Sequence, residues 1–352
     1  MAHGAPSRRA TRNDVARLAG VSTAVVSYVI NDGPRAVAPE TRRRVEEAIL
    51  QLRYRPDRLA QALGRHHRTG LVGVIAPDMR RTFLAEAVYA LEQAASRRGL
   101  TLIAGNSGLR SEREPYYRNV FLGMRVAGLV VVGAAPLPAT VELAESEDTP
   151  VVQLYGPAPA EPIATQVTCD ENESGRLATA HLLDHGHREV CLFAEPDNPV
   201  AAQRAEGWRA AVTDAGAHGR LFAVPGDRHG AFEVARALLG GRTGQRRPVA
   251  VVCGTDEQAL GVIGAARSLG VPVPAGLAVV GQDGIREAAF HMPALTTVTT
   301  DLHRSVRAAL DALRGATTNV DRSATSHEAP SSPHEPPGRP RLQPGGSCGC
   351  EP

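Results

Sequence analysis

The feature that most constrains the fold is a long alternation of short apolar runs with helical segments, from about residue 70 to about residue 315. Runs such as "GLVGVIAP", "VAGLVVVGA" and "PVAVVCGT" are almost continuously apolar, whereas the segments between them carry apolar residues at helical spacing. Continuous apolar strands separated by helices are typical of parallel sheets that are covered on both faces. The pattern therefore predicts an α/β core.

The alternation falls into two sets, with a break between Thr165 and Asp170. We predict two doubly wound parallel-sheet subdomains with a cleft between them. The first comprises about residues 70–165 with a return segment near 298–315, and the second comprises about residues 166–297. Ligands of open α/β sheets bind beyond the carboxyl ends of the strands, so both sets of strand ends should face this cleft.

Residues 11–54 show a different, all-helical pattern. Thr11, followed three residues later by Asp14, is typical of a helix start, Gly20 supplies a turn, and Ser22 can cap a second helix. Two short helices joined by such a turn make a helix-turn-helix, and a third helix opened by Pro39 can cover them. The apolar faces predicted for the three helices are Val15, Leu18 and Ala19; Val25, Val26 and Val29; and Val45, Ala48, Ile49 and Leu52.

The charge is divided unevenly along the chain. Residues 1–68 contain 13 arginines and 6 acidic residues, a net charge of +7, while the whole chain has a net charge of +2. A small basic module on a larger acidic body is typical of a nucleic-acid binder. The N-terminus lacks the apolar segment of a signal peptide and no apolar run has the length of a membrane span, so we expect a cytoplasmic protein. Cys169, Cys191 and Cys253 are expected to be buried free thiols.

The N-terminal motifs "DVARLAGVS", "VSYVIN", "TRRRV" and "LRYRPDRLAQAL" closely resemble the DNA-binding domain of the lactose-repressor (LacI/GalR) family, without a break from Thr11 to Leu63. In the core, "HLLDHGHREV", "QRAEGWRAAV", "LAVVGQDG" and "MPALTTV" resemble periplasmic sugar-binding folds and the repressor core in particular. The resemblance implies a homodimeric transcriptional regulator, most simply a repressor, with tetramers left open. It would bind near-palindromic double-stranded operator DNA and a small-molecule effector, without a cofactor, a membrane or an enzymatic activity.

The resemblance also assigns roles in DNA binding. Residues 55–69 would form a hinge helix and linker, in which Leu63 wedges into the minor groove and Ala60 pairs with its symmetry mate. Ala38 stands where a capping hydroxyl is usual in the family. Thr can hydrogen-bond several bases, and Ala offers an apolar contact. The implied base contacts are Thr23, Ala24 and Tyr28, and the implied phosphate contacts are Ser22, Ser27, Asn31, Thr41 and Arg42.

Seven core residues are candidates for effector binding. The resemblance makes Arg204 and Asp283 the anchors, because a guanidinium fork and a carboxylate can hold paired polar groups. Extra arginines such as Arg80 and Arg81, in a chain with 4% aromatic residues, favour an anionic or highly polar effector over a plain sugar. The remaining candidates are Phe83, Asn106, Asp170, Arg228 and Asp256.

The two ends of the chain have no apolar periodicity. Residues 1–10 are predicted to be a disordered arm, and residues 316–352, rich in Pro, Ser, Gly and His, a disordered tail; the family's last core strand is not recognisable there. No metal site is predicted, because the spacing around His181, His185 and His187 completes no ligand set, and Cys348 and Cys350 form an isolated C-x-C.

Two other functions fit the α/β core. One is a solute-binding protein, against which the missing signal peptide and the basic N-terminal module argue. The other is a cytoplasmic sugar or nucleotide enzyme, for which the sequence offers no catalytic constellation and no dinucleotide-binding glycine motif.

Overall fold

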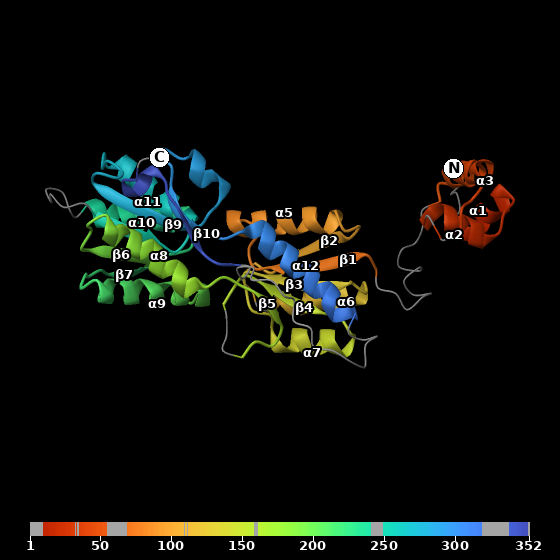
Figure 1. Ribbon diagram of the computed structural model, residues 1–352, viewed down its shortest axis with the longest axis horizontal. Helices are drawn as coiled ribbons and strands as arrows, with labels where there is room; N and C mark the ends of the chain where they lie inside the picture. Colours follow the sequence, from red (N-terminus) through yellow and green to blue (C-terminus); the bar gives the residue numbers. More distant parts are fainter. Residues whose placement is uncertain are drawn as a thin grey trace, which may run out of the picture. The chain divides into compact units, whose positions relative to one another are not determined.

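The structure is a computed structural model of the 352-residue chain. It describes residues 10–31, 33, 35–54, 69–108, 110, 112–157, 161–240, 249–318 and 338–350. The chain forms two compact units, residues 1–69 and residues 70–352 (Figure 1). Within the described ranges, no helix is long and apolar enough to cross a membrane.

The N-terminal unit contains three helices: α1 (Arg12–Ala19), α2 (Thr23–Asn31) and α3 (Pro39–Gln51). The predicted helix start is confirmed as a full capping box, in which the Asp14 amide donates to Thr11 Oγ1 and the Thr11 amide donates to Asp14 Oδ2 at 2.9 Å. Gly20 ends α1 with φ of 65°, a left-handed conformation that glycine adopts without steric cost. This glycine allows α2 to begin within a few residues of the end of α1.

The core of this unit is small and made largely of valine and alanine. Val15, Val26 and Val45 are completely buried, as their helical spacing predicts. The prediction for Leu18 is wrong, because its side chain is 47% exposed and Ala16 is buried in its place. Ala16 and Leu18 flank the Val15–Ala19 stripe at equal angles, because successive residues are about 100° apart, so helical spacing alone does not decide which of them is buried.

The first subdomain of the core is a parallel five-stranded sheet in the order β2-β1-β3-β4-β5. Helix α5 covers one face together with α12, and α6 and α7 cover the other (Figure 1). The strands are β1 (Leu71–Ala76), β2 (Thr101–Asn106), β3 (Gly128–Val132), β4 (Val151–Leu154) and β5 (Thr165–Val167), and the helices are α5 (Thr82–Ser96), α6 (Arg113–Gly123) and α7 (Pro138–Ser146).

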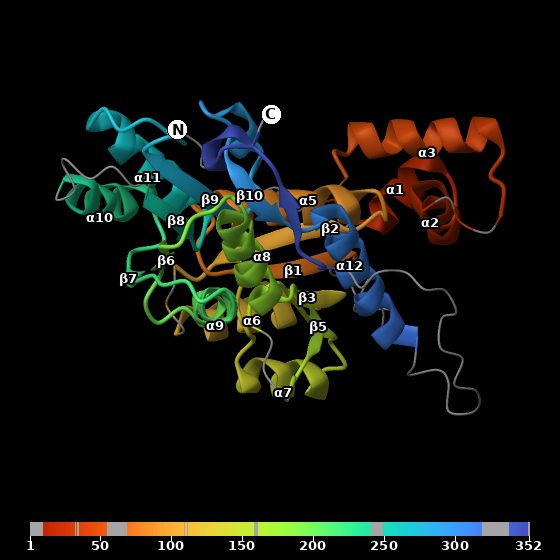
Figure 2. The same ribbon diagram turned by 60° about the vertical axis from the view of Figure 1, so that its left-hand side comes forward.

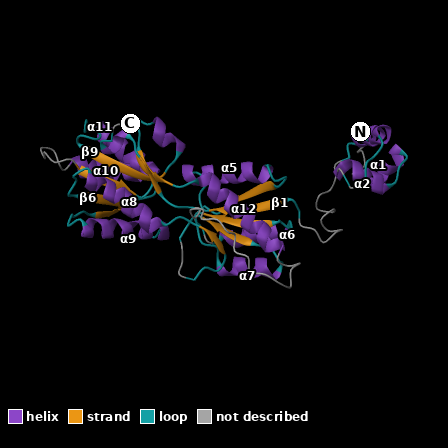
Figure 3. Cartoon of the chain, in the orientation of Figure 1, coloured by secondary structure: helices purple, strands orange, loops and turns teal. Residues whose placement is uncertain are grey.

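The second subdomain is a six-stranded sheet in the order β11-β10-β9-β8-β6-β7, parallel except for β11. Helices α8 and α9 cover one face, and α10 and α11 cover the other. Figure 3 shows the same alternation of strands and helices in both subdomains, which confirms the predicted fold class. The strands are β6 (Val190–Ala194), β7 (Leu221–Ala223), β8 (Val249–Cys253), β9 (Leu277–Asp283), β10 (Thr296–Thr299) and β11 (Arg341–Gln343); the helices are α8 (Glu171–Asp184), α9 (Pro199–Asp214), α10 (Arg228–Gly240) and α11 (Asp256–Ser268), with short 3-10 turns η1 (Arg286–Phe290) and η3 (Gly346–Cys348).

Helices α8 and α9 pack so closely that their backbones touch. A Cβ atom on Gly207 would lie 1.8 Å from the carbonyl oxygen of Asn172, and one on Gly175 would lie 2.0 Å from the carbonyl oxygen of Arg204. The close approach of the two helices therefore requires glycine at both positions, because a Cβ atom would clash with the backbone. The contact fixes α9, which carries Arg204, against the first turns of α8.

Helix α12 (Leu302–Thr318) links the two subdomains. It leaves β10 of the second sheet and packs on the first sheet beside α5 (Figure 2). Val306, Leu310 and Leu313 bury their side chains in the same cluster as Leu91 of α5. This helix occupies the return segment expected near residues 298–315, and it continues three residues into the predicted tail.

The predicted disorder of the tail is wrong for residues 338–350. Strand β11 pairs antiparallel with β10, with Leu342 opposite Val298, and η3 buries Ser347 and Cys348. The Ser347 hydroxyl donates to the Val279 carbonyl at 2.7 Å. A strand of three residues with one apolar side chain is too short to show a periodicity in the sequence. Its order comes from pairing with a strand that is already in place. Residues 319–337 lie outside the described residues.

Candidate functional site

The N-terminus of α2 presents small side chains to solvent. Ser22, Thr23 and Ala24 are exposed, and the Ser22 hydroxyl accepts from the Val25 amide at 3.4 Å. In a helix-turn-helix, the first residues of the second helix meet base edges in the major groove. The predicted base contacts at Thr23 and Ala24 are thus exposed at the position this docking geometry requires.

The other predicted DNA contacts are less exposed. Ser27 and Tyr28 are half-buried, and the Tyr28 ring packs against Gly33. Thr41 and Arg42 lie in the first turn of α3, where the Arg42 guanidinium donates to the Val29 carbonyl at 3.4 Å and so joins α3 to the end of α2. Ala38 makes no side-chain cap, as expected. Asn31 ends α2, but its side chain, Ala60 and Leu63 lie outside the described residues, so their predicted roles stay predictions.

A cleft of about 570 Å³ separates the two subdomains of the core. Residues that directly follow strands of both sheets line it, which confirms that both sets of strand ends face the cleft. They include Pro77 after β1, Gly133 after β3 and Tyr155 after β4, and Glu195 after β6, Gly254 after β8 and Asp283 at the end of β9.

Arg204 is the centre of a buried ion-pair network in this cleft. Its Nε donates to Glu171 Oε2 at 2.7 Å, and its Nη1 donates to Asp283 Oδ1 at 3.0 Å and to the Gly254 carbonyl. Burial raises the pKa of Asp283 to about 6, although Arg204 opposes this shift. Burial also lowers the pKa of Arg204, but the two carboxylates outweigh it and leave this pKa above its ordinary value.

The backbone of Asp283 is strained. Its φ of 116° is a conformation that residues other than glycine rarely adopt. Such strain costs on the order of 1–3 kcal/mol and persists where surrounding contacts enforce it. Here the ion pair with Arg204 holds the carboxylate, and Gly284, with φ of 71°, continues the turn. Backbone strain of this kind clusters at active and ligand-binding sites.

Polar contacts join one subdomain to the other beside the cleft, and outside its lining the Arg286 amide donates to Glu86 Oε1 at 3.2 Å. Arg81, just before α5, pairs with Glu195 through an Nη1–Oε2 hydrogen bond of 2.8 Å, and Thr82 donates to Glu257. Asn198 also donates to Glu195 at 2.7 Å. The subdomains are therefore held together beside the cavity by hydrogen bonds that a ligand can replace or reinforce.

The cleft also has an aromatic wall. The rings of Phe83 and Tyr155 meet edge to face, with centroids 5.0 Å apart, and both line the cavity. Tyr155 was not among the predicted site residues. Its position directly after β4 could have identified it, because the residue after a parallel strand faces the ligand.

The charge of the lining does not favour an anionic effector over a neutral one. Two arginines, Arg81 and Arg204, line the cleft, and both are paired. Arg80 is paired with Asp78. Five acidic residues share the lining, so its formal charge is −3. Apart from Asp283 these acidic residues were not predicted, although most of them closely follow a strand end: Glu171, Glu195, Asp197, Glu257 and Asp283.

Of the seven predicted effector residues, Phe83, Arg204 and Asp283 line the cleft. Asn106 and Asp170 are not among the residues that line it. Asn106 Oδ1 accepts from the Met79 amide at 3.3 Å and braces the loop after β1. Asp170 is exposed and caps α8, because its carboxylate accepts from the Glu173 amide.

Asp256 and Arg228 are also not among the lining residues. The Asp256 carboxylate is fully buried and accepts from the Thr297 hydroxyl at 2.6 Å, so it ties α11 to β10 beneath the cleft. Burial raises the pKa of Asp256 well above its ordinary value. Arg228 pairs with Glu257 and Glu287 outside the lining and reaches the cleft only through Glu257.

A helix-turn-helix unit followed by a two-subdomain α/β core with a polar cleft defines a class of regulator that combines DNA binding with a periplasmic-binding-protein-like core. Family models agree with this division. The model of bacterial regulatory proteins of the lacI family matches residues 11–57, and the model of the periplasmic binding protein-like domain matches residues 179–348. The second match includes β11 and η3.

Curated relatives match most of the chain. The HTH-type transcriptional repressor PurR of Glaesserella parasuis serovar 5 is 32% identical over 327 residues, which cover 92% of each chain. The HTH-type transcriptional repressor PurR of Erwinia tasmaniensis is 35% identical over 295 residues, which cover 82% of this chain and 85% of that one. The chain therefore belongs to the lacI family of bacterial regulatory proteins.

Solved structures share the fold. The Lac repressor dimer bound to operator and the anti-inducer ONPF has a TM-score of 0.77 at 23% identity and covers 97% of this chain and 99% of its own. A putative transcriptional regulator of the LacI family from Sanguibacter keddieii has a TM-score of 0.65 at 28% identity and covers 80% of this chain and 100% of its own.

Proposed function

We propose that this chain is a sequence-specific transcriptional repressor whose affinity for operator DNA is controlled by a small molecule in the cleft. Two features of the same chain carry the proposal. One is the exposed N-terminus of α2 on an arginine-rich unit, and the other is a cleft whose ionic lining is shared by two subdomains. The repressors named among the relatives support it.

The contacts across the cleft suggest how a ligand acts. Arg81 with Glu195, and Thr82 with Glu257, join the first subdomain to the second. A ligand that binds better when these contacts are formed shifts the protein toward that arrangement, and DNA affinity changes with it, because the two binding free energies are coupled. The proposed DNA-bound form is a homodimer on a near-palindromic site.

The lining also suggests the class of ligand. A formal charge of −3 disfavours anions, while the carboxylates of Glu171, Glu195 and Asp283 can accept hydrogen bonds from a ligand. The pair of Phe83 and Tyr155 offers an apolar surface to a flat or ring-shaped molecule. We therefore propose a neutral ring compound rich in N–H or O–H donors.

Selection from random DNA with the full-length chain tests the DNA-binding part. Enriched sites should be near-palindromes, and the logarithm of the association constant should fall linearly with the logarithm of salt concentration, because bound phosphates release counterions. Enrichment without two-fold symmetry would exclude the homodimeric arrangement. Binding without any sequence preference would exclude a sequence-specific repressor.

A thermal-shift screen tests the ligand class. A ligand at about 100 times its dissociation constant stabilises the folded state by ~2.7 kcal/mol. Neutral donor-rich rings should give this shift, and the phosphorylated or carboxylated forms of the same rings should not. The opposite order would contradict the proposed class while leaving the DNA-binding proposal intact.

Ligand affinity should depend on pH through Asp283, whose pKa burial raises to about 6. Below that pH the carboxylate becomes protonated and loses an acceptor, so affinity should fall by up to about tenfold per pH unit. Without ligand, the effect of this group on the stability of the fold has the opposite dependence on pH. The folded state binds this proton more tightly than the unfolded state, so this group stabilises the fold as pH falls from about 6 toward 4. Calorimetric titration across this range measures the first effect, and Asp283→Asn should remove its pH dependence.

A further inference from the structure

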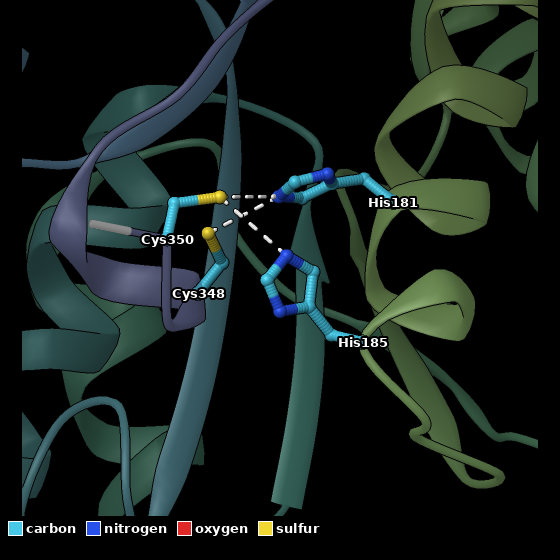
Figure 4. A group of neighbouring side chains, drawn as sticks. All are labelled: His181, His185, Cys348 and Cys350. Atoms are coloured by element: carbon cyan, nitrogen blue, oxygen red, sulfur yellow. Dashed lines mark hydrogen bonds between the residues drawn. The ribbon is translucent and has the colours of Figure 1, made fainter. Parts of the chain in front are cut away.

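The C-terminal segment places two cysteines beside two histidines at the end of α8 (Figure 4). His181 Nε2 lies 3.1 Å from Cys348 Sγ and 3.4 Å from Cys350 Sγ. His185 Nε2 also lies 3.4 Å from Cys350 Sγ. All four potential ligand atoms lie within 4.8 Å of one another. The sequence separates the two pairs so widely that no local spacing could have predicted this cluster.

We propose that His181, His185, Cys348 and Cys350 form a Zn²⁺ site of the Cys₂His₂ type. A tetrahedral site with Zn–S bonds of about 2.3 Å and Zn–N bonds of about 2.0 Å places neighbouring nitrogen and sulfur ligands about 3.5 Å apart. The three measured N–S separations, 3.1, 3.4 and 3.4 Å, are close to that value. Small adjustments of the side chains complete the tetrahedron.

The fold supplies each pair of ligands from one local motif. His181 lies in the last turn of α8 and His185, four residues later, is the residue directly after the helix, so they project from the same face; their ring centroids are 4.6 Å apart. Cys348 and Cys350 flank Gly349, whose φ of 102° is a conformation for glycine. This turn brings both thiols to the side of α8.

The surroundings of the cluster suit a bound cation. Thr296 Oγ1 lies 2.9 Å from Cys348 Sγ and can donate to the thiolate, which is the usual role of groups behind metal ligands. Two thiolates balance the charge of Zn²⁺, so burial of the site adds no net charge. Thiolate and imidazole together favour Zn²⁺ over Mg²⁺ or Ca²⁺, which prefer oxygen ligands.

Four protein ligands fill the coordination sphere, so the site is structural. The metal would join the last turn of α8 to η3 and thereby hold β11 on β10. A strand of only three residues has little pairing energy of its own. Its polar anchors here include the hydrogen bond from the Thr296 amide to the Ser347 hydroxyl and the one from that hydroxyl to the Val279 carbonyl. The inference does not depend on the proposed DNA or ligand binding.

Titration of the reduced, metal-stripped full-length chain with Zn²⁺ and with Co²⁺ tests the site. We expect one Co²⁺ per chain, with the strong visible absorption of tetrahedral cobalt thiolate, and its loss when Zn²⁺ is added. Zn²⁺ should also raise the melting temperature and protect β11 from hydrogen exchange. Absence of the absorption band, or binding of Zn²⁺ without protection of β11, would overturn the proposal.

Variants locate the metal. Cys350→Ser and His185→Ala should each abolish the cobalt band, whereas His187→Ala, a histidine two residues away that is outside the cluster, should keep it. Thr296→Val should weaken binding about tenfold and Thr296→Ser should restore it, because ligand-orienting groups contribute that much. Circular dichroism checks that each variant is folded. Equal metal content in all variants, or a Cys348–Cys350 disulfide that persists under reducing conditions, would exclude the site.

Discussion

Arg204→Ala should abolish the response to ligand and lower the free energy of unfolding by about 3–5 kcal/mol, the usual cost of removing one partner of a buried ion pair. The variant leaves Glu171 and Asp283 without the guanidinium that lies between them. Urea denaturation at neutral pH measures the loss of stability, and operator binding with and without ligand measures the response. The destabilisation should shrink below about pH 6, because Asp283 is then protonated in the folded state.

Two variants control this experiment. Arg209→Ala removes an exposed arginine from the same helix, so its stability should stay within about 0.5 kcal/mol of the parent chain. Arg204→Lys keeps the charge but loses the fork of donors. Its free energy of unfolding should lie between those of Arg204→Ala and Arg209→Ala. If Arg204→Ala were as stable as Arg209→Ala, the network would not be what holds α8, α9 and β9 together at the cleft.

Thr23→Asp should reduce operator affinity by at least about 100-fold without unfolding the N-terminal unit. The new carboxylate would meet the negative charge of DNA, and like charges at an interface cost several kcal/mol, where 1.4 kcal/mol is a factor of ten. The same carboxylate is favourable at the first residue of α2, because helix N-termini stabilise anions. Gel-shift titration measures the affinity, and thermal unfolding checks the fold.

Gln51→Glu is the matched control. It adds the same charge at an exposed position near the end of α3, far along the chain from the N-terminus of α2. Its effect on operator affinity should be limited to a screened, long-range repulsion of a few-fold. Similar losses in both variants would mean that net charge, and not the position of Thr23, controls binding, and the assignment of α2 as the recognition helix would fail.

Local patterns predicted those parts of the molecule that local physics determines. The capping box of Thr11 and Asp14 and the turn at Gly20 involve neighbours in sequence, and both formed as predicted. The apolar strands predicted the two sheets, and the rule for strand ends placed the cleft. Phe83, Arg204 and Asp283, three of the effector candidates, lie in the lining of that cleft, and their roles in binding stay predictions.

Partners distant in sequence account for most of the errors. Arg81 was read from the sequence as an extra positive charge for the effector, but it pairs with Glu195, which is 114 residues away. Asp256 was a candidate ligand contact, yet its carboxylate accepts a hydrogen bond from the Thr297 hydroxyl beneath the cleft. Cys348 lies 167 residues from His181. Charge and spacing along a chain do not reveal which groups will neutralise one another after folding.

The backbone contact between α8 and α9 at Gly175 and Gly207 has a mechanical consequence. Helices that touch so closely cannot slide past each other, so α8 behaves as a stiff rod of 14 residues, about 20 Å long. Glu171 at its first end belongs to the cleft, and His185 lies directly after its last turn, against Cys350. If α8 tilts when a ligand fills the cleft, the C-terminal segment must move with it. A metal ion that fixes this segment to α8 would resist the tilt.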